Sequence, residues 1–487
     1  MNQIICAGFS QKTVTCLIRG FLNKVFSKRL KIGGLALLML TTGAITQERY
    51  EPEWASLDSR PVPGWFTDAK FGIFLHWGLY SVPAWGPTDG SVYEKYAEWY
   101  WRRMMQPDTP AGKKFRDFHD RVYGERFHYQ DFVVDFKTEM FDAEKWAEIF
   151  ENSGAKYVVL TSKHHEGFTL WPSAHSWNWN AWDAGPHRDL AGELSSAVRG
   201  KGLRMGFYFS LYEWFNPLYR EDVHSYVDRH MLPQMKDLVT RYEPDILWPD
   251  GEWDHPSETW RSTEFLAWLY NESPVKDKIA VNDRWGSETR SRHGGFYTTE
   301  YDLVHDRVIA GEVISHPWEE TRGIGGSFGY NRNENLDDYE SSEFLIHYLI
   351  DKVARGGNLL LNVGPTSDGR IPVIQQQRLR DIGDWLRING DAIYGTRVWE
   401  NAPAIDENTS LYFTAKGDDL YAIVTSWDAG DIIIDGLRNP GKVSMFGFEG
   451  EVEFSFSDNR LRITPPPLNP GNNPSQYAWV YRISGAL

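Results

Sequence analysis

The stretch Asp245-Ile246-Leu247-Trp248-Pro249-Asp250-Gly251 is a short apolar run that ends in a carboxylate and a glycine. It has the length and composition of a buried β-strand that meets a turn. Runs of this kind recur between residues 71 and 363, and helical segments separate several of them. The expected strands are 71–77, 157–163, 204–210, 245–250, 279–283, 296–300, about 313–318 and 358–363. Eight strands in this order predict a (β/α)8-like (TIM) barrel.

Helical periodicity between these strands is clearest at 142–152, 189–200, 221–241 and 338–354. Asp142 and Asp189 stand where a side chain can cap the first turn of a helix. The connections around the fifth to seventh strands are too short for full helices, which predicts an irregular side of the barrel. Roughly eighty residues rich in Trp, Tyr and Arg separate the first two strands, and an insertion of that length usually builds a site.

The pattern changes after a helix expected at about 374–389. From residue 396 onward, short runs alternate between apolar and polar residues and are separated by turn signals such as Lys416-Gly417-Asp418-Asp419. This alternation is typical of antiparallel strands with one buried face. We therefore expect a barrel domain over 47–395 and a C-terminal β-sandwich over 396–487.

The composition limits the classes of ligand. The chain has 487 residues and a formal net charge of −16. Binding to nucleic acid needs clustered Lys and Arg, so this charge argues against a nucleic-acid partner. Aromatic residues make up 15% of the chain, and the 22 tryptophans are more than a core of this size needs. A neutral or cationic ligand fits these features better.

The first 46 residues have the pattern of a secretory signal with an upstream segment. Basic residues precede the apolar run 32–40, and small polar residues follow it at 41–44. The apolar run is too short to span a bilayer, so we expect export to the periplasm or the extracellular space without a membrane anchor. Both cysteines, Cys6 and Cys16, fall in this segment. Its removal would leave a cysteine-free protein without thiol nucleophiles or thiolate metal ligands.

Polar residues occur at or just beyond the carboxyl ends of the expected strands. In a parallel barrel these ends meet at one mouth, so the residues should lie together. Asp250 and Glu300 are carboxylates that close two different strands. Two acids in an aromatic cleft suggest glycoside hydrolysis. The full set of strand-end residues is His76, Lys163, His164, His165, Glu166, Tyr208, Asp250, Arg284 and Glu300.

Seven motifs in order resemble the α-L-fucosidases of glycoside hydrolase family 29, and the resemblance covers about residues 50 to 395. Together they are highly specific, although each alone is weak. They are Phe71-Gly72-Ile73-Phe74-Leu75-His76-Trp77-Gly78, Ala97-Glu98-Trp99-Tyr100, Lys163-His164-His165-Glu166-Gly167-Phe168, Gly202-Leu203-Arg204-Met205-Gly206-Phe207-Tyr208, Leu247-Trp248-Pro249-Asp250, Asn282-Asp283-Arg284-Trp285-Gly286 and Gly356-Gly357-Asn358-Leu359-Leu360-Leu361-Asn362-Val363-Gly364-Pro365.

The resemblance implies that Asp250 is the nucleophile of a retaining, metal-independent exo-α-L-fucosidase that needs no cofactor. Its acid/base partner is Glu300 by resemblance to one branch of the family, with Glu319 as the rival from other branches. Asp302 and Asp306 are weaker candidates. Retention requires the two reacting carboxyl groups to lie about 5 to 5.5 Å apart. Asp250 has the alternative role of capping the turn that follows it.

The resemblance also implies a set of residues that bind the sugar of a fucosylated oligosaccharide or glycoconjugate. Phe328 is expected to form an apolar wall for the methyl group of fucose, and neutral imidazoles suit hydroxyl recognition. Trp77, Trp171 and Trp214 fit either the core or the site. The substrate-binding set is His76, Glu98, Trp99, His164, His165, Tyr208, Trp248, Arg284 and Phe328.

Three alternatives stay open at this point. His76, His164, His165 and Asp250 could hold zinc in a metal-dependent hydrolase, but adjacent histidines on an extended strand point to opposite faces unless the backbone bends there. The substrate could be a related L-sugar such as an α-L-galactoside, or the protein could bind sugars without catalysis. Asn362, in the last expected strand, is interpreted as a residue that shapes a backbone turn.

Overall fold

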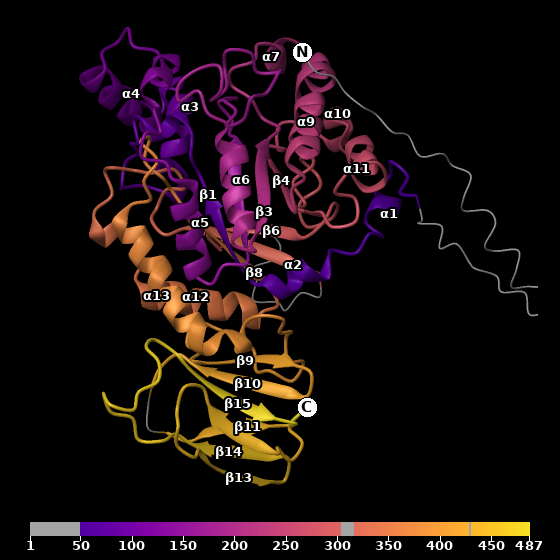
Figure 1. Ribbon diagram of the computed structural model, residues 1–487, viewed down its shortest axis with the longest axis vertical. Coiled ribbons are helices and arrows are strands. Elements are labelled where there is room, and N and C mark those ends of the chain that lie inside the picture. The colour runs from indigo at the N-terminus through magenta and orange to yellow at the C-terminus, as the bar shows by residue number, and fades with distance from the viewer. Residues whose placement is uncertain (1–48, 303–315, 428–429) are drawn as a thin grey trace, which may run out of the picture. The chain divides into compact units, whose positions relative to one another are not determined.

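The computed structural model describes residues 49–302, 316–427 and 430–487 of the chain. Its larger part is a sheet of eight parallel strands surrounded by helices (Figure 1). The strands are fully buried or nearly so, as expected when helices cover a parallel sheet. They are β1 (Phe71–Leu75), β2 (Tyr157–Lys163), β3 (Arg204–Ser210), β4 (Ile246–Asp250), β5 (Ala280–Val281), β6 (Tyr297–Glu300), β7 (Trp318–Gly323) and β8 (Asn358–Val363).

The strand order β5-β4-β3-β2-β1-β8-β7-β6 places β5 and β6 at the two ends of the sheet. A single parallel bridge between Asn282 and Phe296 joins these ends. The sheet therefore curls into the predicted (β/α)8-like barrel, with its weakest closure between the fifth and sixth strands. The irregularity expected on that side is present, because β5 has only two residues.

The expected strand at 313–318 is wrong. Strand β7 begins at Trp318 and ends at Gly323, and residues 303–315 lie outside the described part of the chain. Its sequence, Trp-Glu-Glu-Thr-Arg-Gly, is polar, yet every residue is buried. A search for apolar runs misses a strand whose buried side chains are ionisable and are satisfied by hydrogen bonds.

The helices of the barrel mostly follow the expected ranges. The Asp142 carboxylate accepts a hydrogen bond from the Lys145 amide at 3.2 Å, and the Asp189 carboxylate accepts one from Gly192 at 2.9 Å, so both caps are confirmed. The helices are α1 (Trp54–Leu57), α2 (Gly64–Ala69), α3 (Tyr100–Met104), α4 (Pro110–Val122), α5 (Ala143–Asn152), α6 (Leu190–Gly200), α7 (Leu218–Glu221), α8 (Val223–Tyr226), α9 (Leu232–Tyr242), α10 (Ser257–Trp260), α11 (Ser262–Asn271), α12 (Ser342–Ala354) and α13 (Val373–Asn389).

The helix expected at 221–241 is divided into α8, a π-helical turn at Val227–Met231 and α9. Pro233, near the start of α9, has no amide hydrogen to donate to the carbonyl four residues earlier. The backbone widens to a π-turn just before it, as helices often do around such an interruption.

Residues 411–484 form two antiparallel sheets, in the orders β12-β15-β10-β9 and β11-β14-β13, which confirms the predicted sandwich. In β14 the exposed Arg460 and Arg462 alternate with the buried Leu461 and Ile463, as expected for a sandwich strand with one buried face. The strands are β9 (Leu411–Lys416), β10 (Asp419–Val424), β11 (Ile432–Asp435), β12 (Lys442–Met445), β13 (Glu453–Ser457), β14 (Arg460–Thr464) and β15 (Trp479–Ser484).

Helices α12 and α13 lie beside this sandwich (Figure 1). The indole Nε1 of Trp385 on α13 donates a hydrogen bond to the Ala478 carbonyl at 3.0 Å. The Nε2 of His347 on α12 donates to the Tyr477 carbonyl at 2.7 Å. Directed hydrogen bonds from buried or half-buried side chains thus fix the segment before β15 against the barrel helices.

Candidate active site

A cavity of about 600 Å³ opens where the barrel strands end. Nearly all the residues expected at the site lie in its wall, although they come from eight separate segments of the chain. His76 directly follows β1, and the insertion between β1 and β2 adds Tyr96, Glu98 and Trp99. The lining residues include Phe74, His76, Tyr96, Glu98, Trp99, His164, His165, Tyr208, Trp248, Asp250, Glu252, Trp253, Arg284, Arg290, Glu300 and Phe328.

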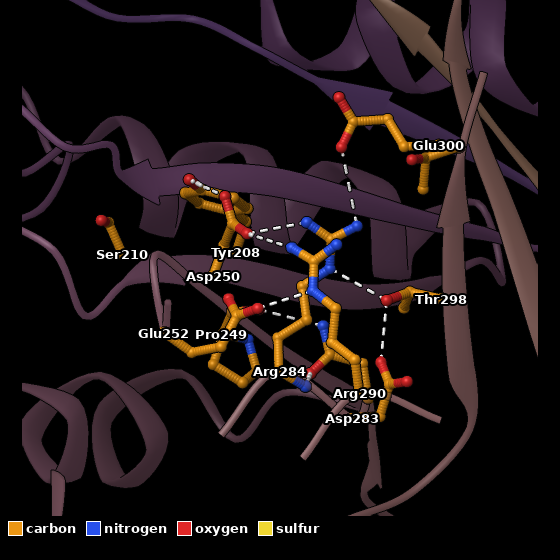
Figure 2. A network of polar contacts seen from close by, with 12 residues as sticks. Tyr208, Ser210, Pro249, Asp250, Glu252, Asp283, Arg284, Arg290, Thr298 and Glu300 are labelled. Carbon is orange, nitrogen blue, oxygen red and sulfur yellow. Dashed lines mark hydrogen bonds and ion pairs between the residues drawn. The ribbon is translucent and has the colours of Figure 1, made fainter. Parts of the chain in front are cut away.

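Asp250 is the last residue of β4, and its side chain is almost fully buried. Arg284 Nη1 donates to its Oδ1 at 2.7 Å, and the Tyr208 hydroxyl donates to its Oδ2 at 2.8 Å (Figure 2). Gly251 follows with φ +77°, and a Cβ there would lie 2.5 Å from the Cβ of Tyr212. Glycine thus permits the sharp turn. Within the described chain the carboxylate bonds to side chains and not to turn amides, so it does not act as a cap.

Charges around Asp250 keep its carboxylate ionised. Burial alone would raise the pKa of Asp250, but Arg284 and the neighbouring Arg290 more than offset it and hold the pKa well below the usual range. Arg290 Nη2 lies 3.9 Å from Asp250 Oδ1, and His165 Nε2 lies 3.9 Å from Oδ2. Burial lowers the pKa of His165 well below its ordinary value, so its ring is neutral and the two guanidinium groups supply the positive charge.

Glu300 is the last residue of β6, and its side chain is 14% exposed. The Tyr96 hydroxyl donates to Glu300 Oε1 at 2.6 Å, and Arg284 Nη2 lies 3.7 Å from Oε2. Figure 2 shows Arg284 reaching both carboxylates, Asp250 through one terminal nitrogen and Glu300 through the other. One guanidinium group therefore sets the relative position of the two acids. Their expected separation of about 5 to 5.5 Å stays a prediction.

Arg284 is itself fixed by a chain of hydrogen bonds. Its Nε donates to Thr298 Oγ1 at 2.9 Å, and the Thr298 hydroxyl donates to Asp283 Oδ1 at 2.8 Å. Its guanidinium also lies over the Trp248 ring, 4.5 Å from the centroid. The planar guanidinium group is already held by Thr298 and by the Trp248 ring. It therefore loses little further conformational freedom when it orients a carboxylate.

Glu319, the rival acid, does not line the cavity. It is fully buried on β7, where it accepts hydrogen bonds from Trp248 Nε1 at 3.0 Å and from the Tyr157 hydroxyl. Burial raises the pKa of Glu319 to about 7, and the two hydrogen bonds oppose that shift only in part. Asp302 also lies off the cavity wall, where Lys352 Nζ donates to it at 2.7 Å, and Asp306 lies outside the described residues.

His164 and His165 line the same cavity, with ring centroids 4.1 Å apart. They lie beyond the extended strand, because β2 ends at Lys163 and the backbone turns there. Burial lowers the pKa of His164 to about 3 and that of His76 well below its ordinary value. All three imidazoles of the site are therefore neutral. Across residues 49–302, 316–427 and 430–487, no three His, Cys, Asp or Glu side chains are grouped as a metal site requires.

Asn362 corrects a further interpretation, because its side chain serves the site. Asn362 Oδ1 accepts a hydrogen bond from His76 Nδ1 at 2.7 Å, and its Nδ2 donates to the Phe328 carbonyl at 2.6 Å. The first bond fixes the tautomer of His76 with the proton on Nδ1, which leaves Nε2 as an acceptor. The second fixes the loop that carries Phe328. Asn362 stands near the end of β8, so the strand-end criterion could have found it.

Phe328 lies against the His76 ring at a centroid distance of 4.8 Å and against Tyr96 at 5.4 Å. Glu98 supports the same loop, since its Oε2 accepts from the Gly329 amide at 2.8 Å. Burial raises the pKa of Glu98 to about 7. Phe328, Tyr96 and the neutral ring of His76 thus form an aromatic group in the cavity wall.

Sequence reasoning missed Tyr96, Glu252 and Arg290. Tyr96 lies in the long insertion, where no strand end marks it. Glu252 Oε1 accepts from Arg290 Nε at 2.6 Å, which places the second guanidinium beside Asp250 (Figure 2). The motif Leu247-Trp248-Pro249-Asp250 stops two residues short of Glu252. The remaining tryptophans, Trp77, Trp171 and Trp214, are buried and lie off the cavity wall, so they belong to the core.

Two carboxylates in an aromatic cavity at the mouth of a (β/α)8-like barrel define a glycoside hydrolase. The family model for alpha-L-fucosidase matches residues 37–391, and the model for the alpha-L-fucosidase C-terminal domain matches residues 406–484. The chain therefore belongs to the alpha-L-fucosidase family, glycoside hydrolase family 29.

Similar proteins cover almost the whole chain. It is 43% identical to tissue alpha-L-fucosidase of Homo sapiens over 93% of this chain and 97% of that protein. It is also 43% identical to an alpha-L-fucosidase of Branchiostoma floridae, over 93% of this chain and 100% of that protein. The crystal structure of the Thermotoga maritima alpha-fucosidase in complex with fucose is similar with a TM-score of 0.74, at 37% identity, over 90% of this chain and 100% of that chain.

The buried state of Glu319 predicts a pH-dependent stability. Because its folded pKa of about 7 exceeds the unfolded value of 4.5, its contribution to stability is complete below pH 4.5 and is lost as the pH rises through 7. Glutamine does not ionise, so the Glu319→Gln variant has no such pH-dependent loss of stability at this position. We expect the free energy of unfolding of the variant, relative to the parent, to rise by about 3 kcal/mol between pH 4.5 and pH 8.

Urea unfolding at both pH values measures this difference, with Glu51→Gln, at an exposed glutamate, as the control. A relative stability of Glu319→Gln that does not change with pH would show that Glu319 is ionised in the fold.

Proposed function

We propose that the protein is a retaining exo-α-L-fucosidase that releases terminal α-L-fucose from oligosaccharides or glycoconjugates with Asp250 and Glu300 as its reacting groups. The observation that carries this proposal is the arrangement around Arg284, which holds one ionised and one solvent-reachable carboxylate in a single cavity. The family of the chain supplies the sugar and the retaining outcome.

In the first step the Asp250 carboxylate attacks C1 of the sugar while Glu300, protonated, gives its proton to the leaving oxygen. The C1–O bond to the aglycone breaks, and an ester bond from Asp250 to C1 forms. In the second step Glu300 takes a proton from water, the water oxygen attacks C1 and the ester bond breaks. Asp250 is suited to the nucleophilic role because it is ionised, and Glu300 to proton transfer because the Tyr96 hydroxyl orients it.

Neutral side chains face the sugar hydroxyls in this proposal. His76 offers its Nε2 as an acceptor, the neutral rings of His164 and His165 add further hydrogen-bonding nitrogens, and Glu98, Trp99, Tyr208, Trp248 and Arg284 complete the polar and aromatic wall. Phe328 would pack against the C6 methyl of fucose. An α-L-galactoside adds one hydroxyl at that position, and an apolar wall rejects such an addition only weakly. Activity on a related L-sugar is therefore the second candidate.

The rings of Phe74 and Trp248 are buried and line the cavity. Export is supported by the signal-like pattern of residues 1–46, which lie outside the described residues. No described helix is long and apolar enough to cross a membrane.

The proposed domain boundary at residues 395 and 396 falls in the gap between the two family models, which end and begin at residues 391 and 406.

The proposed activity is tested with a panel of aryl glycosides of L-fucose, L-galactose and D-sugars, followed by proton NMR of the first-formed sugar. We expect fast release from the α-L-fucoside, weaker release from the α-L-galactoside, and the α-anomer as the first product. A first-formed β-anomer would contradict the covalent mechanism, and preference for a D-sugar would contradict the substrate.

The acid/base role of Glu300 is tested by comparing Glu300→Ala with Glu319→Ala. On an aryl fucoside whose leaving group needs no proton, the Glu300→Ala variant should keep rapid first-step chemistry, while its turnover of natural linkages should fall about 10²- to 10⁴-fold. Pre-steady-state release of the phenol measures the first step.

The Glu319→Ala variant should lose stability instead, since it leaves the Trp248 and Tyr157 donors without a partner. If only the Glu319→Ala variant keeps rapid first-step chemistry on the activated aryl fucoside while its turnover of natural linkages falls, Glu319 is the acid.

A further inference from the structure

A second cavity, of about 780 Å³, lies between helix α13 and the loops of the C-terminal sandwich. It shares no lining residue with the cavity at the barrel mouth. Its wall combines aromatic rings with uncharged or acidic polar groups, and the main ones are Asp384, Trp385, Trp427, Asn473, Tyr477 and Trp479. The reaction proposed above uses none of them.

Two half-buried tryptophans provide the aromatic surface. The rings of Trp427 and Trp479 have centroids 5.1 Å apart and planes at 56°, so they form two tilted sides of a hollow. Trp479 is fixed there, because its Nε1 donates to Asn473 Oδ1 at 2.9 Å. Rings that are rigid and partly open to solvent suit ligands with one apolar face and polar edges.

Tyr477 is held in a strained conformation beside these rings. Its φ of +71° lies in the left-handed region, which a bulky aromatic residue seldom adopts. The bonds from His347 to the Tyr477 carbonyl and from Trp385 to the Ala478 carbonyl hold the backbone on both sides of the strained residue. Strain of this kind is concentrated at binding and catalytic sites.

Polar groups at the cavity remain available for a ligand. Asn473 uses its Oδ1 for internal bonds to Trp479 and the Ser475 amide, and no described residue accepts from its Nδ2. Asp384 is 55% exposed, and only its Oδ1 is paired, with Arg387 at 2.8 Å. No Lys or Arg lines the cavity, which disfavours an anionic ligand.

We propose that this cavity is a second carbohydrate-binding site, which takes neutral pyranose units of an oligosaccharide. The C–H faces of a pyranose would pack on Trp427 and Trp479, and its hydroxyl groups would bond to Asn473 and Asp384. The identity of the ligand as part of a fucosylated glycan rests on the proposed function. The site would hold glycan away from the barrel mouth and raise the local concentration of chain ends.

The test is a calorimetric titration of the full protein with lacto-N-neotetraose, a neutral tetrasaccharide without fucose, in excess L-fucose. The Trp427→Ala variant should bind about fivefold to tenfold more weakly than the parent, since it loses a stacking surface. Asp384→Ala, at an exposed helix position that should not disturb folding, should weaken binding about threefold. The matched control is Trp177→Ala, at a tryptophan that is 79% exposed on the barrel and should leave the affinity unchanged.

Absence of binding to the parent protein overturns the proposal, and so does equal affinity in the parent, Trp427→Ala and Asp384→Ala proteins. A similar loss in Trp177→Ala also overturns it, because surface stacking would then be unspecific. Hydrolysis of an aryl α-L-fucoside should be unchanged in all three variants. A parent protein that binds the tetrasaccharide but hydrolyses no aryl fucoside would contradict the proposed function and leave the binding site standing.

Discussion

The ion pair between Arg284 and Asp250 is the contact on which the rest of the site depends. A carboxylate as buried as Asp250 would lose its charge without a partner, and removing one member of such a pair costs about 3–5 kcal/mol. Arg284 can meet this demand because Thr298 and the Trp248 ring already hold it in place. It therefore orients Asp250 without moving, and the same guanidinium faces Glu300.

The surroundings then give the acidic groups different roles. Asp250 faces two guanidinium groups and stays ionised, whereas Glu300 has the Tyr96 hydroxyl, a longer contact with Arg284 and access to the cavity. Glu319 has no access to the cavity, and burial raises its pKa to about 7. The neutral histidines add hydrogen-bonding capacity without competing for the positive role of Arg284. An ionised carboxylate beside a guanidinium group and neutral hydrogen-bonding side chains suits the double-displacement mechanism proposed above.

Much of this arrangement was predictable because parallel barrel strands end at one mouth. Asp250, Arg284 and Glu300 were found from strand ends alone, and β3 and β8 have the predicted bounds. The burial of Glu319 was not predictable in this way. Strand β7 has a polar sequence, so the search for apolar runs placed its start too early in the chain. With the strand shifted, Glu319 takes the second position of β7 and not a position at its end.

Residues that act from loops or through other side chains also escaped the sequence. Tyr96 is in a long insertion with no periodicity, and its contact with Glu300 spans 204 positions of the chain. Asn362 was assigned to a turn because one sequence cannot show that its amide connects His76 to the Phe328 loop. Long-range hydrogen bonds of this kind follow from the packed fold and have no local signature.

The most direct measurement of the central claim is to trap the covalent intermediate. The protein is treated with 2-deoxy-2-fluoro-α-L-fucosyl fluoride, digested and mapped by mass spectrometry. The account predicts a single fluorofucosyl ester on the peptide that contains Asp250, with no label in an Asp250→Asn variant. Labelling of a different carboxylate, or full inactivation without any covalent label, would contradict it.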